Sequence, residues 1–411
     1  MKKLLVLISV VLFAATFMFA AEEVEVFSWW TGGGEEEGLN ALIELFNEWY
    51  PDVEVINATV AGGAGTNAKA VLKTRMLGGN PPDSFQVHAG KELSDTYVIT
   101  GLMEPLTGLL EEWGILDKFP EDILSICSYE GEVYSIPVNV HRGNVIFANN
   151  AILEEAGVEE IPLDWDGFFA AMDKIKEAGY IPLSLGDKNK WTATHLFEDI
   201  LAATLGPDGY NGLWDGSVSF DDPKVVEAVE IFGRLMDYVN EDHAAGTWQD
   251  ATLMVKDGKA AMNVMGYWAE GYLKTLGWTP GEEFSWSVVP GNDGIFMVVS
   301  DTFGMPKSAP NPENAEKWLK VMSSVEGQDI FNPIKGSIPA RVDADKSLYD
   351  AYLTWSMDDF ATNALLPSIA HGSAAPEGFI TALHDAINAF VTDRNVDKCV
   401  DAIVEAADDN L

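Results

Sequence analysis

Cysteine is scarce in this chain: Cys127 and Cys399 are its only two cysteines. They have neither the spacing of a metal site nor a Cys-x-x-Cys redox arrangement, so the sequence predicts neither. One disulfide in an oxidising compartment and two buried free thiols are equally compatible with this pair.

Basic residues are also few, with 25 Lys and Arg against 65 Asp and Glu, which gives a formal net charge of −40 at pH 7. Such an excess repels phosphates and therefore argues against nucleic-acid and anionic-membrane partners. The acidic residues are spread along the chain rather than gathered in blocks, so we interpret them as solvated surface. The charge favours a highly soluble protein in an external compartment.

Long apolar runs are confined to the beginning of the sequence. Lys2 and Lys3 precede the apolar run 4–19, and small residues follow at Ala20 and Ala21. This pattern predicts a secretory signal peptide over residues 1–21, and hence a periplasmic or extracellular location. A single spanning anchor is the alternative. No cysteine follows the run to accept a lipid, and later apolar stretches are short or broken by charge.

Motifs of the common catalytic classes are missing. There is no Gly-x-Ser-x-Gly, no His-Glu-x-x-His and no Gly-x-x-x-x-Gly-Lys-Ser/Thr, and the glycines at 32–34 are followed by glutamates that would repel a phosphate. His243 and His384 have no second ligand at metal spacing. We therefore expect no cofactor, no metal and no enzyme. Carboxylates are so abundant that a pair at glycosidase spacing would arise by chance, which leaves a secreted glycoside-processing enzyme as a minor alternative.

The most informative stretch that is present is Phe27–Gly38, Phe-Ser-Trp-Trp-Thr-Gly-Gly-Gly-Glu-Glu-Glu-Gly. The alternating residues 23–26 before it predict a strand, and the apolar periodicity of 39–49 after it predicts a helix. In open α/β sheets, this junction lies at the ligand crevice. Trp29 and Trp30 point to opposite sides of an extended backbone, so one can pack inward while the other faces the crevice. The alternative is a turn with two core tryptophans.

The rest of the chain alternates between strand and helix patterns. Strands are predicted at 53–56, 84–88, 145–148 and 259–264, and helices at 67–77, 168–178, 223–238 and 312–325. Residues 129–133 form a hairpin-like turn, and extended crossings are predicted at 133–138, 296–301 and 334–339. Alternating strands and helices imply a largely parallel sheet covered on both faces. We predict two discontinuous α/β lobes joined by a three-segment hinge, one of residues 22–136 plus 300–337 and the other of 137–299 plus 338–411.

Several of these segments resemble one family. They are the Trp-Trp-Thr-Gly-Gly-Gly-Glu turn, Asn80–Asp83 before a strand, Tyr134–Pro137 at the first crossing, and the helix Asn314–Leu319. The sequence resembles the extracellular solute-binding proteins of bacterial ABC sugar importers over essentially its whole mature length. The turn, Gln86–His88 and Val140–Asn144 look like the subgroup that binds glucose and related monosaccharides.

The resemblance implies a two-lobed periplasmic-binding-protein fold of type II, which closes on a sugar and delivers it to a permease as a monomer. Carried over position by position, it implies sugar-binding residues at Trp30 or alternatively Trp29, and at Glu35, Gln86, His88, Trp248, Trp268, Asp301, Lys335 and His371. The expected ligand is glucose, galactose or mannose, with a di- or oligosaccharide as the alternative.

The residue chemistry fits a pyranose ring, which has apolar C–H faces and hydroxyls that both donate and accept. Indole rings supply flat apolar faces, and charged groups make the stronger hydrogen bonds. Each position also has an ordinary structural interpretation. Asp301 ends an apolar strand and could be a turn residue, and His88 could be a buried histidine that supports its neighbours.

Overall fold

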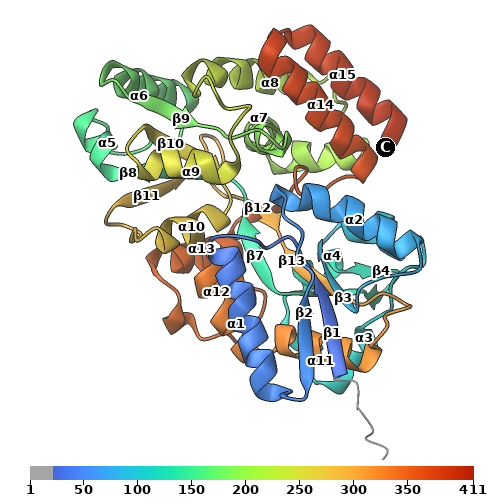
Figure 1. Ribbon diagram of the computed structural model, residues 1–411. Coiled ribbons are helices and arrows are strands. Elements are labelled where there is room, and N and C mark those ends of the chain that lie inside the picture. Colours follow the sequence, from blue (N-terminus) through green and yellow to red (C-terminus); the bar gives the residue numbers. More distant parts are fainter. Residues whose placement is uncertain (1–21) are drawn as a thin grey trace, which may run out of the picture.

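The computed structural model describes residues 22–411, so the predicted signal peptide at 1–21 lies outside the described residues. Within 22–411, no helix is both long and apolar enough to cross a membrane. Figure 1 shows an elongated molecule in which the first strands and helices gather at one end and the middle of the chain forms the other end.

The first sheet has the strand order β2-β1-β3-β13-β6. Its strands are β1 (Glu22–Phe27), β2 (Val53–Asn57), β3 (Ser84–His88), β6 (Ser135–Pro137) and β13 (Asp301–Gly304). Strand β1 pairs in parallel with β2 and β3, whereas β13 is antiparallel to both β3 and β6. The sequence therefore predicts the parallel arrangement correctly for the first three strands. The prediction is wrong for β13, which enters this sheet from the far part of the chain and runs in the opposite direction. It is also wrong for most strand pairs of the two sheets described below, which are antiparallel.

Helices surround this sheet. They are α1 (Gly34–Trp49), α2 (Thr66–Leu77), α3 (Thr107–Glu112), α4 (Glu121–Ile126), α11 (Pro312–Ser323) and α12 (Val325–Lys335). The turn predicted at 129–133 is also present, as the hairpin of β4 (Ser128–Tyr129) and β5 (Glu132–Val133).

The second sheet has the order β11-β8-β10-β9 and forms the other end of the molecule. Its strands are β8 (Val145–Asn149), β9 (Ile181–Ser184), β10 (Ala260–Met265) and β11 (Phe284–Val288). The accompanying helices are α5 (Asn150–Glu155), α6 (Trp165–Glu177), α7 (Trp191–Asp215), α8 (Pro223–Leu235), α9 (Trp248–Lys256), α10 (Trp268–Thr275), α14 (Glu377–Asp393) and α15 (Val396–Asn410).

A third sheet, β14-β7-β12-β15, lies between the other two. It consists of β7 (Asn139–Arg142), β12 (Ile295–Val299), β14 (Ile338–Pro339) and β15 (Ala364–Pro367), with α13 (Ala351–Thr362) inserted before β15. Only Val138 separates β6 from β7, and only Ser300 separates β12 from β13. The first two predicted crossings therefore lie where the first and third sheets share continuous chain.

The third predicted crossing is only partly right. Residues 334 and 335 are helical rather than extended, because α12 begins at the Ser324 cap, whose side chain accepts from Gly327 N, and continues to Lys335. Gly336, with φ of 77°, ends the helix in the left-handed conformation that suits glycine. Only Ile338–Pro339 is a strand.

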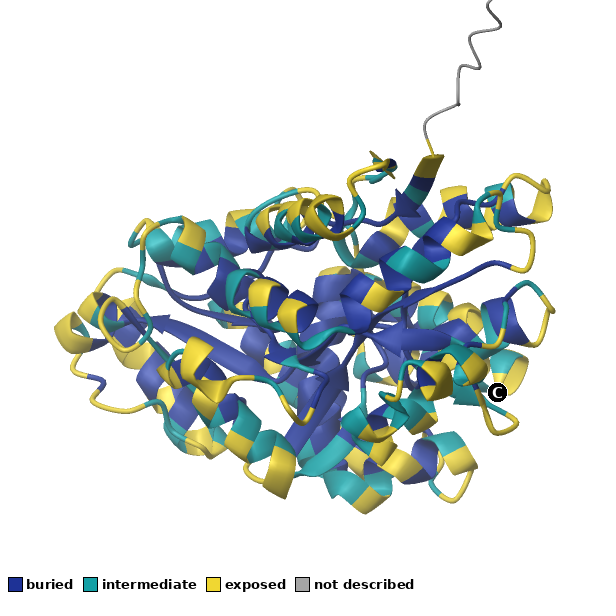
Figure 2. Cartoon of the chain, turned by 90° about the horizontal axis from the view of Figure 1, so that it is seen from below, coloured by how far each residue is buried: buried dark blue, intermediate teal, exposed yellow. Residues whose placement is uncertain are grey.

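Two groups of buried apolar side chains form the core. One includes Val24 and Trp318 beside the first sheet, and the other includes Phe197 and Phe379 beside the second. Figure 2 shows buried strands inside and exposed residues on the outer faces of the helices.

Cys127 belongs to the first of these groups and Cys399 to the second, and both are free thiols. The alternative of a disulfide between them is therefore wrong. Burial raises the pKa of each thiol to about 12, so neither is poised to react.

Candidate functional site

A cavity of about 350 Å³ lies where the first sheet, the middle sheet and the helices of the second end meet. It is lined by Trp29, Glu35, Ala64, His88, His141, Trp191, Trp248, Trp268, Val299, Asp301, Lys335 and His371. Most of the side chains singled out from the sequence are among them, namely Trp29, Glu35, His88, Trp248, Trp268, Asp301, Lys335 and His371. The fold thus brings together residues that are scattered over almost the whole chain.

The two adjacent tryptophans separate as an extended backbone requires. Trp29 lines the cavity, and its ring lies 4.9 Å from the ring of His88. Trp30 points the other way and is 1% exposed, with its ring 4.8 Å from Phe331 and 5.5 Å from Phe303. Of the two alternatives, the structure therefore puts Trp29 at the cavity and Trp30 in the core.

Gln86 does not line the cavity either. Its Oε1 accepts from the backbone N–H of Trp29 at 3.1 Å, and its Nε2 donates to Asp301 at 2.8 Å. Because both of these partners do line the cavity, Gln86 supports the wall from behind.

Asp301, at the start of β13, is the centre of the polar part of the cavity. It accepts from Gln86 Nε2, from Asn139 Nδ2 at 2.9 Å and from His141 Nε2 at 3.2 Å. Burial by itself raises the pKa of Asp301, but the hydrogen bond from His141 and the charge of Lys335 outweigh burial and hold its pKa below the usual range. The carboxylate is therefore charged at neutral pH and can accept a further hydrogen bond.

A buried ion pair forms another polar part of the wall. Lys335 Nζ, at the end of α12, lies 2.7 Å from Glu35 Oε1 in the first turn of α1. Burial raises the pKa of Glu35, and the charge of Lys335 opposes this rise. Lys335 can only donate, and one carboxylate oxygen does not use all of its protons.

His88 is held by a second carboxylate. Its Nδ1 lies 2.9 Å from Glu92 Oε2, and Lys69 Nζ lies 2.6 Å from the same oxygen. Burial raises the pKa of Glu92, but the charges of Lys69 and His88 outweigh burial and lower it. The imidazole is thereby fixed between Glu92 and the cavity.

The apolar wall is a group of indole rings. Trp248 and Trp268 are the first residues of α9 and α10, and Trp191 is the first residue of α7. The rings of Trp191 and Trp268 lie 6.1 Å apart, and each lies close to His371, at 5.3 and 5.1 Å. Trp191 is not among the residues predicted from the sequence, because α7 was not predicted either, although a tryptophan at the start of a long apolar helix is a recognisable signal.

A glycine-rich loop closes over these rings. Ala64 lines the cavity from the segment Gly62–Gly65. A Cβ at Gly63 would lie 2.9 Å from Trp191 Nε1 and 3.4 Å from Trp248 Cδ1. The loop therefore approaches the indoles so closely that a side chain at Gly63 would displace them.

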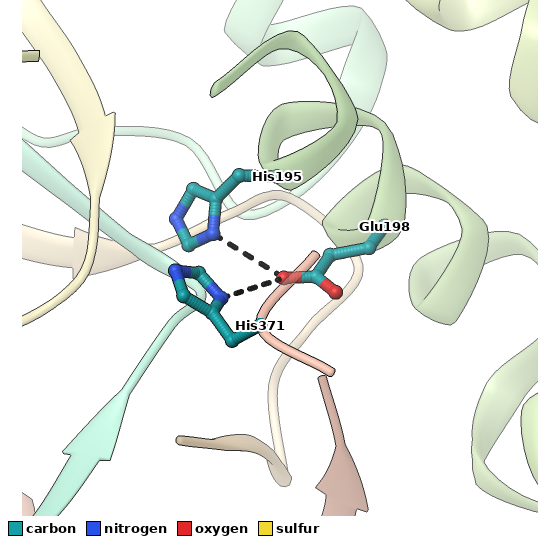
Figure 3. Close-up of side chains that lie close together, drawn as sticks. All are labelled: His195, Glu198 and His371. Atoms are coloured by element: carbon teal, nitrogen blue, oxygen red, sulfur yellow. Dashed lines mark ion pairs between the residues drawn. The ribbon is translucent and has the colours of Figure 1, made fainter. Parts of the chain in front are cut away.

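A buried cluster of side chains that includes His371 was also not predicted from the sequence. Its members are His195 and Glu198, both from α7, and His371 from the loop after β15 (Figure 3). Their ligand-type atoms lie within 4.8 Å of one another, a grouping that could hold a metal ion. The sequence does not indicate this cluster, because Glu198 and His371 come from distant parts of the chain.

Comparison with known proteins identifies a family. The family model described as "Bacterial extracellular solute-binding protein" matches residues 32–329. An uncharacterized ABC transporter extracellular-binding protein of Pyrococcus horikoshii is 40% identical over 393 residues, covering 95% of this chain and 88% of that protein. A probable sugar-binding periplasmic protein of Mesorhizobium japonicum is 34% identical, covering 96% and 97%. A xylose/arabinose-binding protein of Haloferax volcanii is 30% identical, covering 93% and 84%.

Solved structures share the fold. A chitin oligosaccharide binding protein matches with a TM-score of 0.84 at 19% identity, over 95% of this chain and 99% of that one. A bacterial solute receptor with an exclusive preference for β-D-galactopyranose matches with a TM-score of 0.84 at 19% identity, over 95% and 98%. At such identities, the likeness establishes the α/β periplasmic-binding-protein fold alone.

Proposed function

Because the chain belongs to the bacterial extracellular solute-binding proteins, we propose that it is the sugar-binding component of an ABC importer and takes up a glucose-type monosaccharide. Galactose and mannose are the related candidates. As a member of this family, the chain is a binding protein and not an enzyme. In the proposed role, it works as a monomer in the periplasm or outside the cell and delivers its sugar to a permease.

The cavity is the observation that carries this proposal. Indole faces from Trp29, Trp191, Trp248 and Trp268 line one part of it, and Asp301 lies in the other. Indole rings can stack on the C–H faces of a pyranose, while charged acceptors and donors suit its hydroxyls. Such a division into flat apolar walls and a charged rim is what a sugar ring requires.

The crowding of polar side chains in the cavity favours one ring. Glu35, His88, Asp301, Lys335 and His371 all line the same small space. A hydroxyl missing from the ligand would leave one of these groups buried without a partner, so deoxy sugars should lose affinity steeply.

Calorimetry tests this proposal with glucose, galactose, mannose, xylose, maltose and cellobiose. We expect a glucose-type hexose to bind at roughly micromolar Kd or tighter, about −8 kcal/mol or stronger. Disaccharides should bind at least about tenfold more weakly. Trp49→Ala is a matched control, because Trp49 is 38% exposed on α1 and does not line the cavity. No binding of any sugar would refute the proposal.

A di- or oligosaccharide ligand is the second candidate, and one observation favours it. A larger cavity of about 830 Å³ adjoins the first and shares Ala64 and Trp191 with it. Lys69 and Tyr97 line this second cavity, so a second ring would find both a charge and an aromatic ring there. If maltose or cellobiose outcompetes glucose, this assignment replaces the monosaccharide.

A further inference from the structure

The cluster behind the cavity contains a hydrogen-bonded chain that ends at His371. Glu198 Oε1 lies 3.2 Å from His195 Nδ1 and 3.9 Å from His371 Nδ1 (Figure 3). Ser368 Oγ lies 2.9 Å from both carboxylate oxygens of Glu198 and 2.9 Å from His371 Nδ1. All four side chains are buried, so water does not compete for these contacts.

Glu198 acts as the acceptor in this chain. Its Oε2 accepts the backbone N–H of Ile369 at 2.7 Å and that of Ala370 at 3.0 Å. Because these two backbone donors converge on the carboxylate, Glu198 is placed as the acceptor of the contact with Ser368 as well, and the proton between the two side chains comes from the serine hydroxyl. Ser368 therefore uses its only hydroxyl proton in the hydrogen bond to Glu198.

Ser368 Oγ then has only its two acceptor positions left. One of them accepts the backbone N–H of His371 at 3.2 Å. The other faces His371 Nδ1 at 2.9 Å, and a hydrogen bond there requires the proton to be on Nδ1. The hydroxyl is then fully used, with one hydrogen bond donated and two accepted.

We propose that Ser368 and Glu198 are positioning residues that fix the tautomer of His371, with the proton on Nδ1 and the bare Nε2 as an acceptor for the ligand. This assignment deepens the proposed function, because it makes His371 select a ligand hydroxyl that donates. Neither Ser368 nor Glu198 lines the cavity itself.

Two features support a single, fixed state of the ring. Burial lowers the pKa of His371 well below its ordinary value, and the nearby His195, His88 and Lys69 act in the same direction. The imidazole is therefore neutral at pH 7 and carries one N–H. The rings of Trp191 and Trp268 pack against it and restrict its rotation.

The same three ligand-type side chains could be interpreted as a metal site, but the hydrogen bonds argue against this. A cation bound to Glu198 and His371 would displace the contacts of Ser368, which lies within hydrogen-bond distance of both. It would also compete with the two backbone donors on Glu198. The hydrogen-bonded chain accounts for the carboxylate without an ion.

Nitrogen NMR of the imidazole rings tests the tautomer directly and without sugar. Two-bond ¹H–¹⁵N correlations of the ¹⁵N-histidine-labelled protein should show His371 with a protonated Nδ1 and a bare Nε2, assigned by comparison with His371→Gln. In Ser368→Ala, the signal should move toward the Nε2–H form, and Ser368→Thr, which retains a hydroxyl, should restore the original pattern. Ser373→Ala is the matched control, because the Ser373 hydroxyl in the same loop donates to Ala89 O instead.

A wild-type protein with the proton on Nε2, or a tautomer unchanged in Ser368→Ala, would overturn the inference, as would shifts of the His195 and His371 nitrogens on addition of Zn²⁺. Calorimetry separates this outcome from the fate of the proposed function. We expect Ser368→Ala to bind glucose at least tenfold more weakly than Ser373→Ala does. If the tautomer changes as expected while neither wild type nor Ser373→Ala binds any sugar, the positioning role stands and the sugar-binding proposal falls.

Discussion

Replacing each of the two adjacent tryptophans by alanine separates a ligand contact from a core contact. Trp29 and Trp30 have the same side chain and neighbouring positions, so differences between the variants report on surroundings alone. Trp29 lines the cavity, whereas Trp30 is 1% exposed and packs against Phe303 and Phe331. We therefore expect Trp30→Ala mainly to lower the stability of the fold and Trp29→Ala mainly to weaken sugar binding.

The magnitudes follow from these surroundings. Trp30→Ala removes a large, fully packed core side chain and should lower the free energy of unfolding by about 3–5 kcal/mol. Trp29→Ala should cost less stability, because part of the ring faces the cavity. It should instead weaken sugar binding by about 1–3 kcal/mol, the range for loss of an aromatic stacking face on a nucleic-acid base, used here as a loose analogue. That range corresponds to a Kd roughly 5- to 150-fold higher.

Urea unfolding without sugar and calorimetry with glucose measure the two effects independently. The binding experiment is done at a temperature at which both variants are folded. If Trp30→Ala is folded and lowers affinity as much as Trp29→Ala, or if Trp29→Ala binds normally, the assignment of Trp29 to the ligand side is refuted.

Three further predictions concern shape, packing and protonation. Gly266→Ala should weaken glucose binding by at least about tenfold, because its Cβ would lie 2.2 Å from the ring of Trp268; unchanged calorimetry would show that the ring yields freely. Saturating sugar should reduce the radius of gyration in small-angle scattering, since a ligand that favours the closed form shifts the protein toward it; an unchanged radius would favour a rigid cleft. Burial lowers the pKa of His384 from 6.5 to about 4, with Lys69 and Lys190 acting in the same direction. Below pH 6.5 the unfolded chain then binds a proton that the folded one does not, so the free energy of unfolding of wild type relative to His384→Gln should fall by up to about 1.4 kcal/mol per pH unit down to about pH 4. If the free energies of unfolding of wild type and His384→Gln, measured with urea, differ by the same amount at every pH from 7 to 4, this pKa is contradicted.

The division into two hinged lobes stays a prediction that scattering can test. The chain passes directly from β6 to β7 and from β12 to β13, which is where a hinge requires few backbone changes. Contacts of the loop after β15 with the first end of the molecule, such as Glu92 N to Gly372 O at 2.8 Å, belong to the form described here.

The sequence by itself determined the features that are local. Periodicity located β1, β3 and α6, because this signal involves residues only a few positions apart. The alternation of an extended backbone separated Trp29 from Trp30, although it did not say which of them faces inward.

Only the tertiary structure decided which residues meet. Trp29 faces the cavity because the other side of its strand end packs Trp30 against Phe303 and Phe331, and these partners are more than two hundred residues away. The chain from Glu198 through Ser368 to His371 likewise joins α7 to the loop after β15. Contacts between such distant segments leave no periodicity in the sequence, because their spacing is set by how the sheets and helices pack and not by the geometry of any one of them.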